Sequence, residues 1–231
     1  MQLETRRFPS RAALDAALAD RLEQALRGAR GPTALMLSGG HTPLPAYGEL
    51  ARRRPPLPQE LYVLYSDDRY VPADSPASNY HATRPLLAAL GLAEERVLRV
   101  RTELPLEQAA LDYERRLGEL LSRGVRVGLG LLGLGADGHT ASLFRADDLK
   151  RAAGRLAIAV QRPDGMSGVS VTPRFLREVA EPLFVVAGGG KFDAIRALRE
   201  QDPHLVALEA VSDCPSVELW VDQAAEFSLQ A

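Results

Sequence analysis

Apolar residues recur at helical spacing near the start of the chain. From Leu14 to Leu26 an apolar residue returns every three or four positions, with charged residues between. This period predicts an amphipathic helix that packs on a sheet. Ser10, which follows Pro9, is the expected N-cap, and the helix is expected to end near Gly28 and Gly31.

Six apolar runs of strand length lie further along the chain, and helical patterns separate most of them. The runs cover residues 34–37, 61–65, 125–134, 156–160, 183–187 and 217–221. Helical patterns cover residues 44–50, 82–90, 106–121, 175–179 and 192–198. Continuous apolar runs are typical of strands buried on both faces of a parallel sheet.

This alternation predicts the fold class. We expect an α/β protein with a single doubly wound three-layer α/β/α domain over residues 1–231 and a mostly parallel, Rossmann-like sheet. In such sheets, ligands bind beyond the carboxyl ends of the strands. The loops that follow the strands are therefore the place to look for function.

Composition and charge narrow the classes of function. The chain has 231 residues, a formal net charge of −2 and 46% hydrophobic residues, enough for a large core without disulfides or metals. Without a basic face or a polybasic tail, neither nucleic acid nor membrane is an expected partner. A single cysteine, Cys214, no apolar leader and no run of about 20 apolar residues predict a cytoplasmic protein.

The first strand runs into a glycine loop that precedes a helical pattern. In this loop, Gly39 and Gly40 let backbone N–H groups turn toward a ligand, and the hydroxyls of Ser38 and Thr42 add donors. The dipole of the following helix favours phosphate. The spacing matches neither a dinucleotide fingerprint nor a Walker loop. A plain tight turn is the alternative.

The second strand ends in a cluster of charges. Arg69 is suited to pairing with a phosphate, and Asp67 or Asp68 to binding a sugar hydroxyl or orienting a catalytic group. The alternative is a turn in which the acids and the arginine satisfy one another, with Ser78 or Asn79 capping the next helix.

The segment of residues 132–144 closes the most apolar run of the chain. It places Asp137 two residues before His139, among glycines that allow close backbone approach. A histidine in a loop at a strand end is exposed enough to titrate near neutrality, as a general base must. We therefore predict that His139 is a general base.

Other readings of this segment are weaker. Ser142 lacks the G-x-S-x-G elbow that exposes a serine nucleophile. His139 has no second ligand at the i, i+4 spacing of zinc helices, so no metal is expected. His81 and His204 are expected to be structural, and the role of His41 stays open.

A third glycine-rich loop ends in a cation. Residues 183–187 run into three glycines, after which Lys191 precedes a helical pattern. A lysine on its mobile stem supplies a point charge to a phosphate. A solvated lysine at a helix start is the alternative, although the helix dipole disfavours it there.

Taken together, four segments resemble one known family. SGGHTP, SDDRYVPADSPASNY, LGLGADGHTASLF and GGGK follow strands in this order and resemble the 6-phosphogluconolactonase family over most of the chain. That family is similar in fold to glucosamine-6-phosphate deaminases. The resemblance implies hydrolysis of 6-phospho-D-glucono-1,5-lactone to 6-phospho-D-gluconate in the oxidative pentose phosphate pathway. We expect no cofactor, a sugar-phosphate lactone as the partner, and a monomer or small homo-oligomer.

The resemblance also implies roles for individual residues. His139 is implied as the base that deprotonates water, with Asp67 and Asp137 nearby to orient the substrate or the histidine. The residues implied in phosphate binding are Gly39, Gly40, Thr42, Arg69 and Lys191. Asn79 matches the Ser-Asn pair of the family and is expected to help shape the site.

The chain departs from the family pattern in places. His41 stands where the family usually has serine and Asp68 where it has glutamate, and neither change removes the proposed chemistry. Gly168 stands where an arginine often assigned to phosphate is expected. Arg162 and Arg174 are the candidates to replace it.

Two rival functions follow from the same motifs. A glucosamine-6-phosphate deaminase or sugar-phosphate isomerase would use the same cradle, but an acid is expected in the segment after the histidine, where this chain has Thr-Ala-Ser-Leu-Phe-Arg. A non-catalytic sugar-phosphate sensor would bind the ligand without turnover, and the chain has no residues left over for a DNA-binding module.

Overall fold

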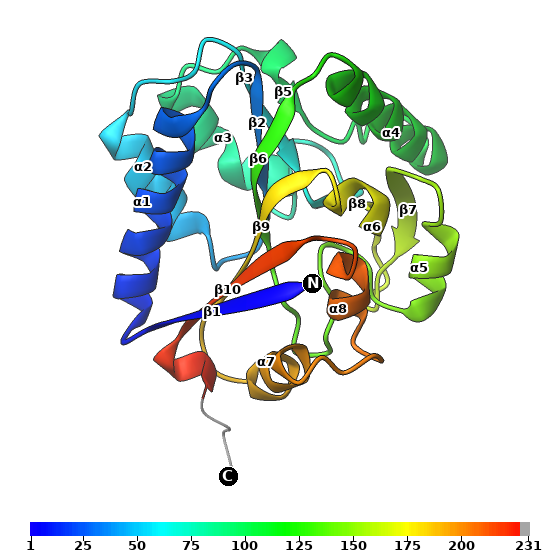
Figure 1. Ribbon diagram of the computed structural model, residues 1–231. Helices are drawn as coiled ribbons and strands as arrows, with labels where there is room; N and C mark the ends of the chain where they lie inside the picture. The colour runs from blue at the N-terminus through cyan, green and yellow to red at the C-terminus, as the bar shows by residue number, and fades with distance from the viewer. Residues whose placement is uncertain (227–231) are drawn as a thin grey trace.

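The computed structural model describes residues 1–226, in which seven parallel strands form a central sheet in the order β1-β10-β9-β6-β2-β3-β5 (Figure 1). These strands are β1 (Gln2–Phe8), β2 (Thr33–Leu37), β3 (Leu61–Tyr65), β5 (Val97–Leu98), β6 (Arg126–Leu132), β9 (Val179–Val186) and β10 (Ser216–Asp222). Every residue of β2 and β3 is buried. Burial on both faces explains why these strands read as continuous apolar runs.

Helices cover both faces of this sheet, and the buried side chains of the described residues form one hydrophobic cluster on each side. One cluster includes α1 (Arg11–Gly28), α2 (Leu44–Arg53) and α3 (Asn79–Ala89). The other includes α4 (Leu106–Ser122), α5 (Ala146–Arg151), α6 (Pro173–Leu176), α7 (Phe192–Arg199) and α8 (Val206–Val211). Short 3₁₀ turns lie at Glu94–Arg96 and Gln223–Glu226. The three-layer doubly wound fold predicted from the sequence is confirmed.

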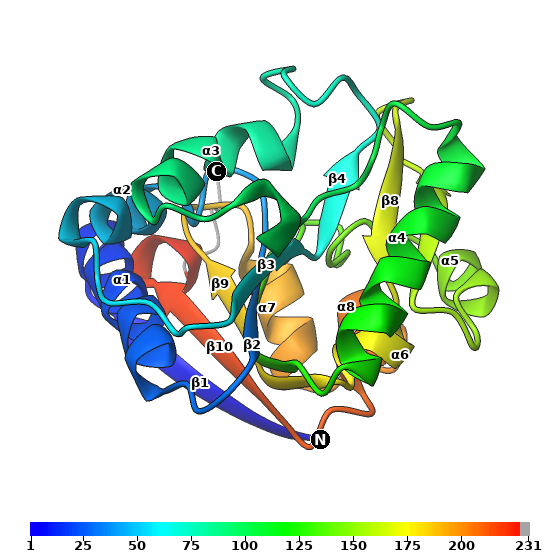
Figure 2. The ribbon, with the colours of Figure 1, turned by 90° about the horizontal axis from the view of Figure 1, so that it is seen from above.

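A small antiparallel sheet stands beside the central one, and its strands within residues 1–226 follow the order β4-β8-β7. These strands are β4 (Asp67–Arg69), β7 (Ala157–Gln161) and β8 (Ser167–Val171). Figure 2 shows β4 and β8 next to α4, on the side of the molecule away from α1. The apolar run at residues 156–160 therefore forms a strand as predicted, but in this sheet. Its placement in the parallel sheet was wrong, because a buried run does not reveal which strand it pairs with.

The first helix matches its sequence pattern closely. The Ser10 hydroxyl accepts a hydrogen bond from the backbone N–H of Ala13 at 3.2 Å, which caps the helix as predicted. The helical pattern at residues 175–179 is only partly correct, because α6 ends at Leu176 and Val179 already opens β9. Strand β1 was missed: it is an edge strand, and apart from Phe8 its residues are at least partly exposed, so it carries no apolar run.

Within residues 1–226, no helix combines the length and the apolar character that crossing a bilayer requires.

Candidate functional site

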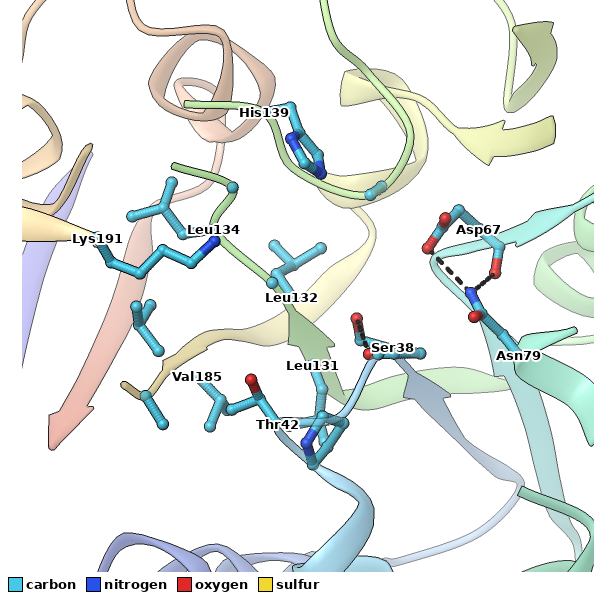
Figure 3. A pocket seen from close by; sticks show the side chains of 18 of the residues that line it. Ser38, Thr42, Asp67, Asn79, Leu131, Leu132, Leu134, His139, Val185 and Lys191 are labelled. Carbon is cyan, nitrogen blue, oxygen red and sulfur yellow. Dashed lines mark hydrogen bonds between the residues drawn. The ribbon is translucent and has the colours of Figure 1, made fainter. Parts of the chain in front are cut away.

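A pocket opens where the carboxyl ends of β2, β3, β6 and β9 meet, at the place expected for this fold (Figure 3). Of the site residues predicted from the sequence, all but Asp137 line it. These are Ser38, Gly39, Gly40, Thr42, Asp67, Arg69, Asn79, His139 and Lys191. Its apolar wall includes Leu131, Leu132, Leu134, Val185 and Val186. Loops far apart in the sequence therefore converge on one cavity.

The glycine loop after β2 is held against the body of the protein. The Tyr47 hydroxyl, on α2, donates to the Ser38 carbonyl at 3.0 Å and accepts from the Ser38 N–H at 3.3 Å. Gly40 has φ of +79°, a conformation that side chains disfavour. At Gly39 a Cβ atom would lie well under 3.0 Å from the side-chain amide of Asn79. The side chain of Asn79 therefore packs so closely on the loop that only glycine fits at position 39.

Asn79 ties together the polar residues of the second loop. Its Nδ2 donates to the Asp67 carbonyl at 2.8 Å and more weakly to the Asp67 carboxylate at 3.4 Å. Its Oδ1 accepts from Arg69 at 3.0 Å, and Arg69 also donates to the Ala77 carbonyl. Because Asn79 is 3% exposed, these bonds are sheltered from water and hold Asp67 and Arg69 in place.

The two neighbouring aspartates of β4 have different roles. The Asp68 carboxylate accepts from the backbone N–H groups of Asn79 and Tyr80 and from the Ser78 hydroxyl, at the start of α3. Burial raises the pKa of Asp68 to about 6, and these hydrogen bonds offset only part of that rise. Asp68 is absent from the pocket lining, so the structural reading applies to it. Asp67, which faces the pocket, remains the candidate for ligand contact.

Ser142 and Arg162 complete the surroundings of Asp67. The Ser142 hydroxyl donates to Asp67 Oδ2 at 2.6 Å and accepts from Arg162 Nη1 at 2.9 Å. Ser142 is fully buried and absent from the pocket lining. It has the environment of a structural hydroxyl, as the missing serine-nucleophile motif indicated.

His139 and Asp137 form a pair at the end of β6. The carboxylate Oδ1 of Asp137 lies 2.5 Å from Nδ1 of His139, which leaves Nε2 as the ring nitrogen available to a ligand. Burial raises the pKa of Asp137, but the hydrogen bond and charge of His139 outweigh it, so the pKa is lowered overall. A Cβ atom at Gly135 would collide with both side chains. The glycine spacing of this segment therefore makes room for the pair.

The His139 ring also packs on Phe144, with 4.4 Å between ring centroids. The guanidinium of Arg162 also lies over the Phe144 ring, with its Cζ 5.1 Å from the ring centroid. Arg162 lines the pocket, whereas Arg174 borders a separate hollow near Gly154. Of the two arginines named as replacements for the one missing at position 168, the structure brings only Arg162 to the site.

Lys191 lies just before α7 and lines the pocket opposite Asp67 and Asn79 (Figure 3). Among residues 1–226 it forms no ion pair. His41 does not line the pocket. In the described part of the chain, no group of three or more His, Cys, Asp or Glu residues is arranged to hold a metal ion.

The fold and the pocket define an α/β protein with a polar pocket at the carboxyl ends of parallel strands, lined by glycine loops, cations and His139, which pairs with Asp137. Residues 9–219 match the family of glucosamine-6-phosphate isomerases/6-phosphogluconolactonase. The chain belongs to this family.

Several individual relatives of the chain are named 6-phosphogluconolactonase. The 6-phosphogluconolactonase of Thermotoga maritima is 33% identical over 173 residues, which cover 73% of this chain and 76% of the relative. Human 6-phosphogluconolactonase is 33% identical over 219 residues, covering 87% and 84%. A crystal structure of the Thermotoga protein superposes with a TM-score of 0.82 at 27% identity, over 96% of this chain and 100% of that one.

The fold alone does not separate the two activities of the family. A structure of a monomeric glucosamine-6-phosphate deaminase superposes with a TM-score of 0.81 at 16% identity, over 96% of this chain and 98% of the deaminase. At this identity the likeness concerns the fold, so an argument for either activity depends on the site.

Proposed function

We propose that the protein, an enzyme of this family, hydrolyses 6-phospho-D-glucono-1,5-lactone to 6-phospho-D-gluconate in the oxidative pentose phosphate pathway. The observation that carries the proposal is the His139–Asp137 pair, 2.5 Å apart, at a pocket that is also lined by a glycine loop and several cations. The names of the relatives support the same substrate.

The reacting end of the site centres on His139. Nε2 takes a proton from water as the water oxygen attacks the lactone carbonyl carbon, and Asp137 stabilises the imidazolium through Nδ1. When the tetrahedral intermediate collapses, the bond from that carbon to the ring oxygen breaks, and the imidazolium returns the proton to the ring oxygen. A lactone is an activated ester, so a positioned water and a base suffice for this reaction.

The remainder of the pocket orients the substrate. Arg69, Arg162 and Lys191 line it, and Asp67 is the one carboxylate among its described lining residues, so the lining favours an anion. The backbone of the Gly39–Gly40 loop, the Thr42 hydroxyl, Arg69 and Lys191 are the proposed phosphate contacts. Asp67, anchored by Asn79 and Ser142, is the proposed acceptor for a sugar hydroxyl. Holding the phosphate fixes the lactone carbonyl relative to His139.

The proposal is tested with purified protein and freshly prepared lactone. Acid release is followed against the spontaneous rate, and a parallel reaction contains glucosamine 6-phosphate. We expect acceleration with the lactone alone. Ammonia release from the amino sugar would instead indicate the deaminase activity, and binding of 6-phosphogluconate without any turnover would indicate a sensor. Either outcome contradicts the proposal.

A further inference from the structure

Arg162 enters the pocket from a tight hairpin between β7 and β8. The Arg162 N–H donates to the Met166 carbonyl at 2.9 Å, and the Gly165 N–H donates to the Arg162 carbonyl at 3.1 Å. The Arg162 side chain is 11% exposed, yet it lines the pocket. These hydrogen bonds fix the backbone of Arg162 in the hairpin, and the side chain extends from there into the pocket.

Three contacts fix the guanidinium in one orientation. It lies 5.1 Å from the centroid of the Phe144 ring, its Nη1 donates to Ser142 at 2.9 Å, and its Nε donates to Asp164 at 3.2 Å. Nη2 has no acceptor among residues 1–226. Stacking and two hydrogen bonds thus preorganise a planar group that still has donors to offer.

Direct ion pairing accounts for only part of this arrangement. Asp67 is the buried carboxylate nearby, and at 4.0 Å from Arg162 Nη1 it lies at the outer limit of an ion pair, with the Ser142 hydroxyl bonded to both. The direct partner, Asp164, is 41% exposed in its side chain, so water screens that pair. A largely buried guanidinium whose one buried counter-charge is reached mainly through a bridging hydroxyl is suited to an anionic ligand.

The stem of Arg162 lies beside a glycine of the neighbouring strand. Gly168 is paired with Val160 on β7 and with Arg69 on β4, so these positions share one face of the small sheet. A Cβ atom at Gly168 would lie 3.6 Å from Arg162 Cδ. The stem of Arg162 therefore passes over Gly168, on the sheet face that carries Arg69.

From this geometry we propose that Arg162 binds the phosphate group of the ligand together with Arg69, and that it sets the preference for phosphorylated over unphosphorylated lactones. This inference rests on the proposed function. Two guanidinium groups on one face of a sheet offer a phosphate dianion several hydrogen bonds in a fixed geometry.

The test compares one enzyme on two substrates. Rates are measured with 6-phosphogluconolactone and with glucono-1,5-lactone, which lacks the phosphate, for wild type, Arg162→Ala and Arg162→Gln. Losing a charge-assisted hydrogen bond should lower kcat/KM for the phosphorylated lactone about 10- to 100-fold. The loss with glucono-1,5-lactone should be smaller, because it reflects only the contacts that Arg162 makes with Ser142 and Phe144. Arg174→Ala, at the separate hollow, is the matched control and should leave both rates unchanged.

Calorimetric titration with 6-phosphogluconate gives a second measurement that does not depend on turnover. We expect Arg162→Gln, which keeps a hydrogen-bonding side chain but not the charge, to weaken binding about 10-fold or more. An equal loss on both substrates, or an unchanged Kd, would overturn the inference. If the wild type failed to accelerate lactone hydrolysis at all, the proposed function would fail instead, whereas normal wild-type turnover with unchanged Arg162 variants rejects only the inference.

Discussion

Replacing Gly39 by alanine tests whether the glycine loop and Asn79 are mechanically coupled. The new Cβ would lie well under 3.0 Å from the Asn79 amide group, so Asn79 must move. Its hydrogen bonds to the Asp67 carbonyl at 2.8 Å and from Arg69 at 3.0 Å would then be lost or lengthened. The expected result is loss of both stability and substrate binding.

The size of the effect follows from these contacts. Overpacking costs about 1–3 kcal/mol. A lost neutral hydrogen bond costs about 1 kcal/mol, and one to a charged partner about 1.5–3 kcal/mol. The sum is about 3.5–7 kcal/mol of unfolding free energy. For a chain of this size, that corresponds to a fall in Tm of at least about 7 °C.

Gly40→Ala is the matched comparison. Gly40 has φ of +79°, but a Cβ atom there would meet nothing within 4 Å. Its cost is therefore only that of a left-handed alanine, about 1–2 kcal/mol. The Tm and the KM of both variants are measured, and Gly39→Ala is expected to show the lower Tm and the higher KM. If Gly39→Ala were no less stable than Gly40→Ala and bound the lactone normally, the coupling between the loop and Asn79 would be refuted.

Four further variants test other parts of the site. His139→Ala should lower kcat about 10²- to 10⁴-fold while the melting curve stays near that of wild type, and a near-normal kcat would reject the general-base role. Asp137→Asn should lower kcat about 10- to 100-fold with little change in KM, because it removes a charge-assisted hydrogen bond. Phe144→Leu should lower kcat/KM about 3- to 30-fold, since the ring contacts both His139 and the guanidinium next to it; unchanged kinetics would exclude a positioning role. Burial raises the pKa of Asp68 from 3.8 to about 6, so its contribution to stability is present below pH 3.8 and is lost as the pH rises through about 6. Wild type should therefore gain about 2 kcal/mol relative to Asp68→Asn between pH 7 and pH 4. Urea unfolding at both pH values measures this gain, and an equal change in the two proteins would contradict the assignment.

Sequence patterns predicted the features of this protein that depend on local periodicity. The helix α1 has a regular apolar stripe and a serine cap, and both are sufficient to define it. Strand β7 has an equally clear apolar run, but its pairing with β8 depends on a hairpin and on packing against α4. Pattern reasoning therefore found the strand and placed it in the wrong sheet.

The same limit applies to the site. Asp137 and His139 are two residues apart in one glycine-rich loop, so their pairing is visible in the sequence. Asp67 and Asp68 are adjacent on a strand, and alternation predicts that they face opposite sides. Which of them faces the pocket is decided by the position of α3, whose first N–H groups bind Asp68. The position of α3 depends on tertiary packing, which the local sequence pattern does not reveal.

Arg162 illustrates how a pocket can acquire a cation that motif comparison does not single out, since the sequence left Arg162 and Arg174 as equal candidates. A motif assigns a role to a position along the chain, whereas a ligand responds only to where the charged group lies in space. In an antiparallel hairpin, residues on adjacent strands share one face, so a side chain from either strand can reach the same volume. Here the strand that pairs with β4 carries Gly168, and the stem of Arg162, which follows β7 in the hairpin, lies against it. Position 168 and the Arg162 guanidinium therefore have to be judged together, because both lie on the face of the small sheet that carries Arg69.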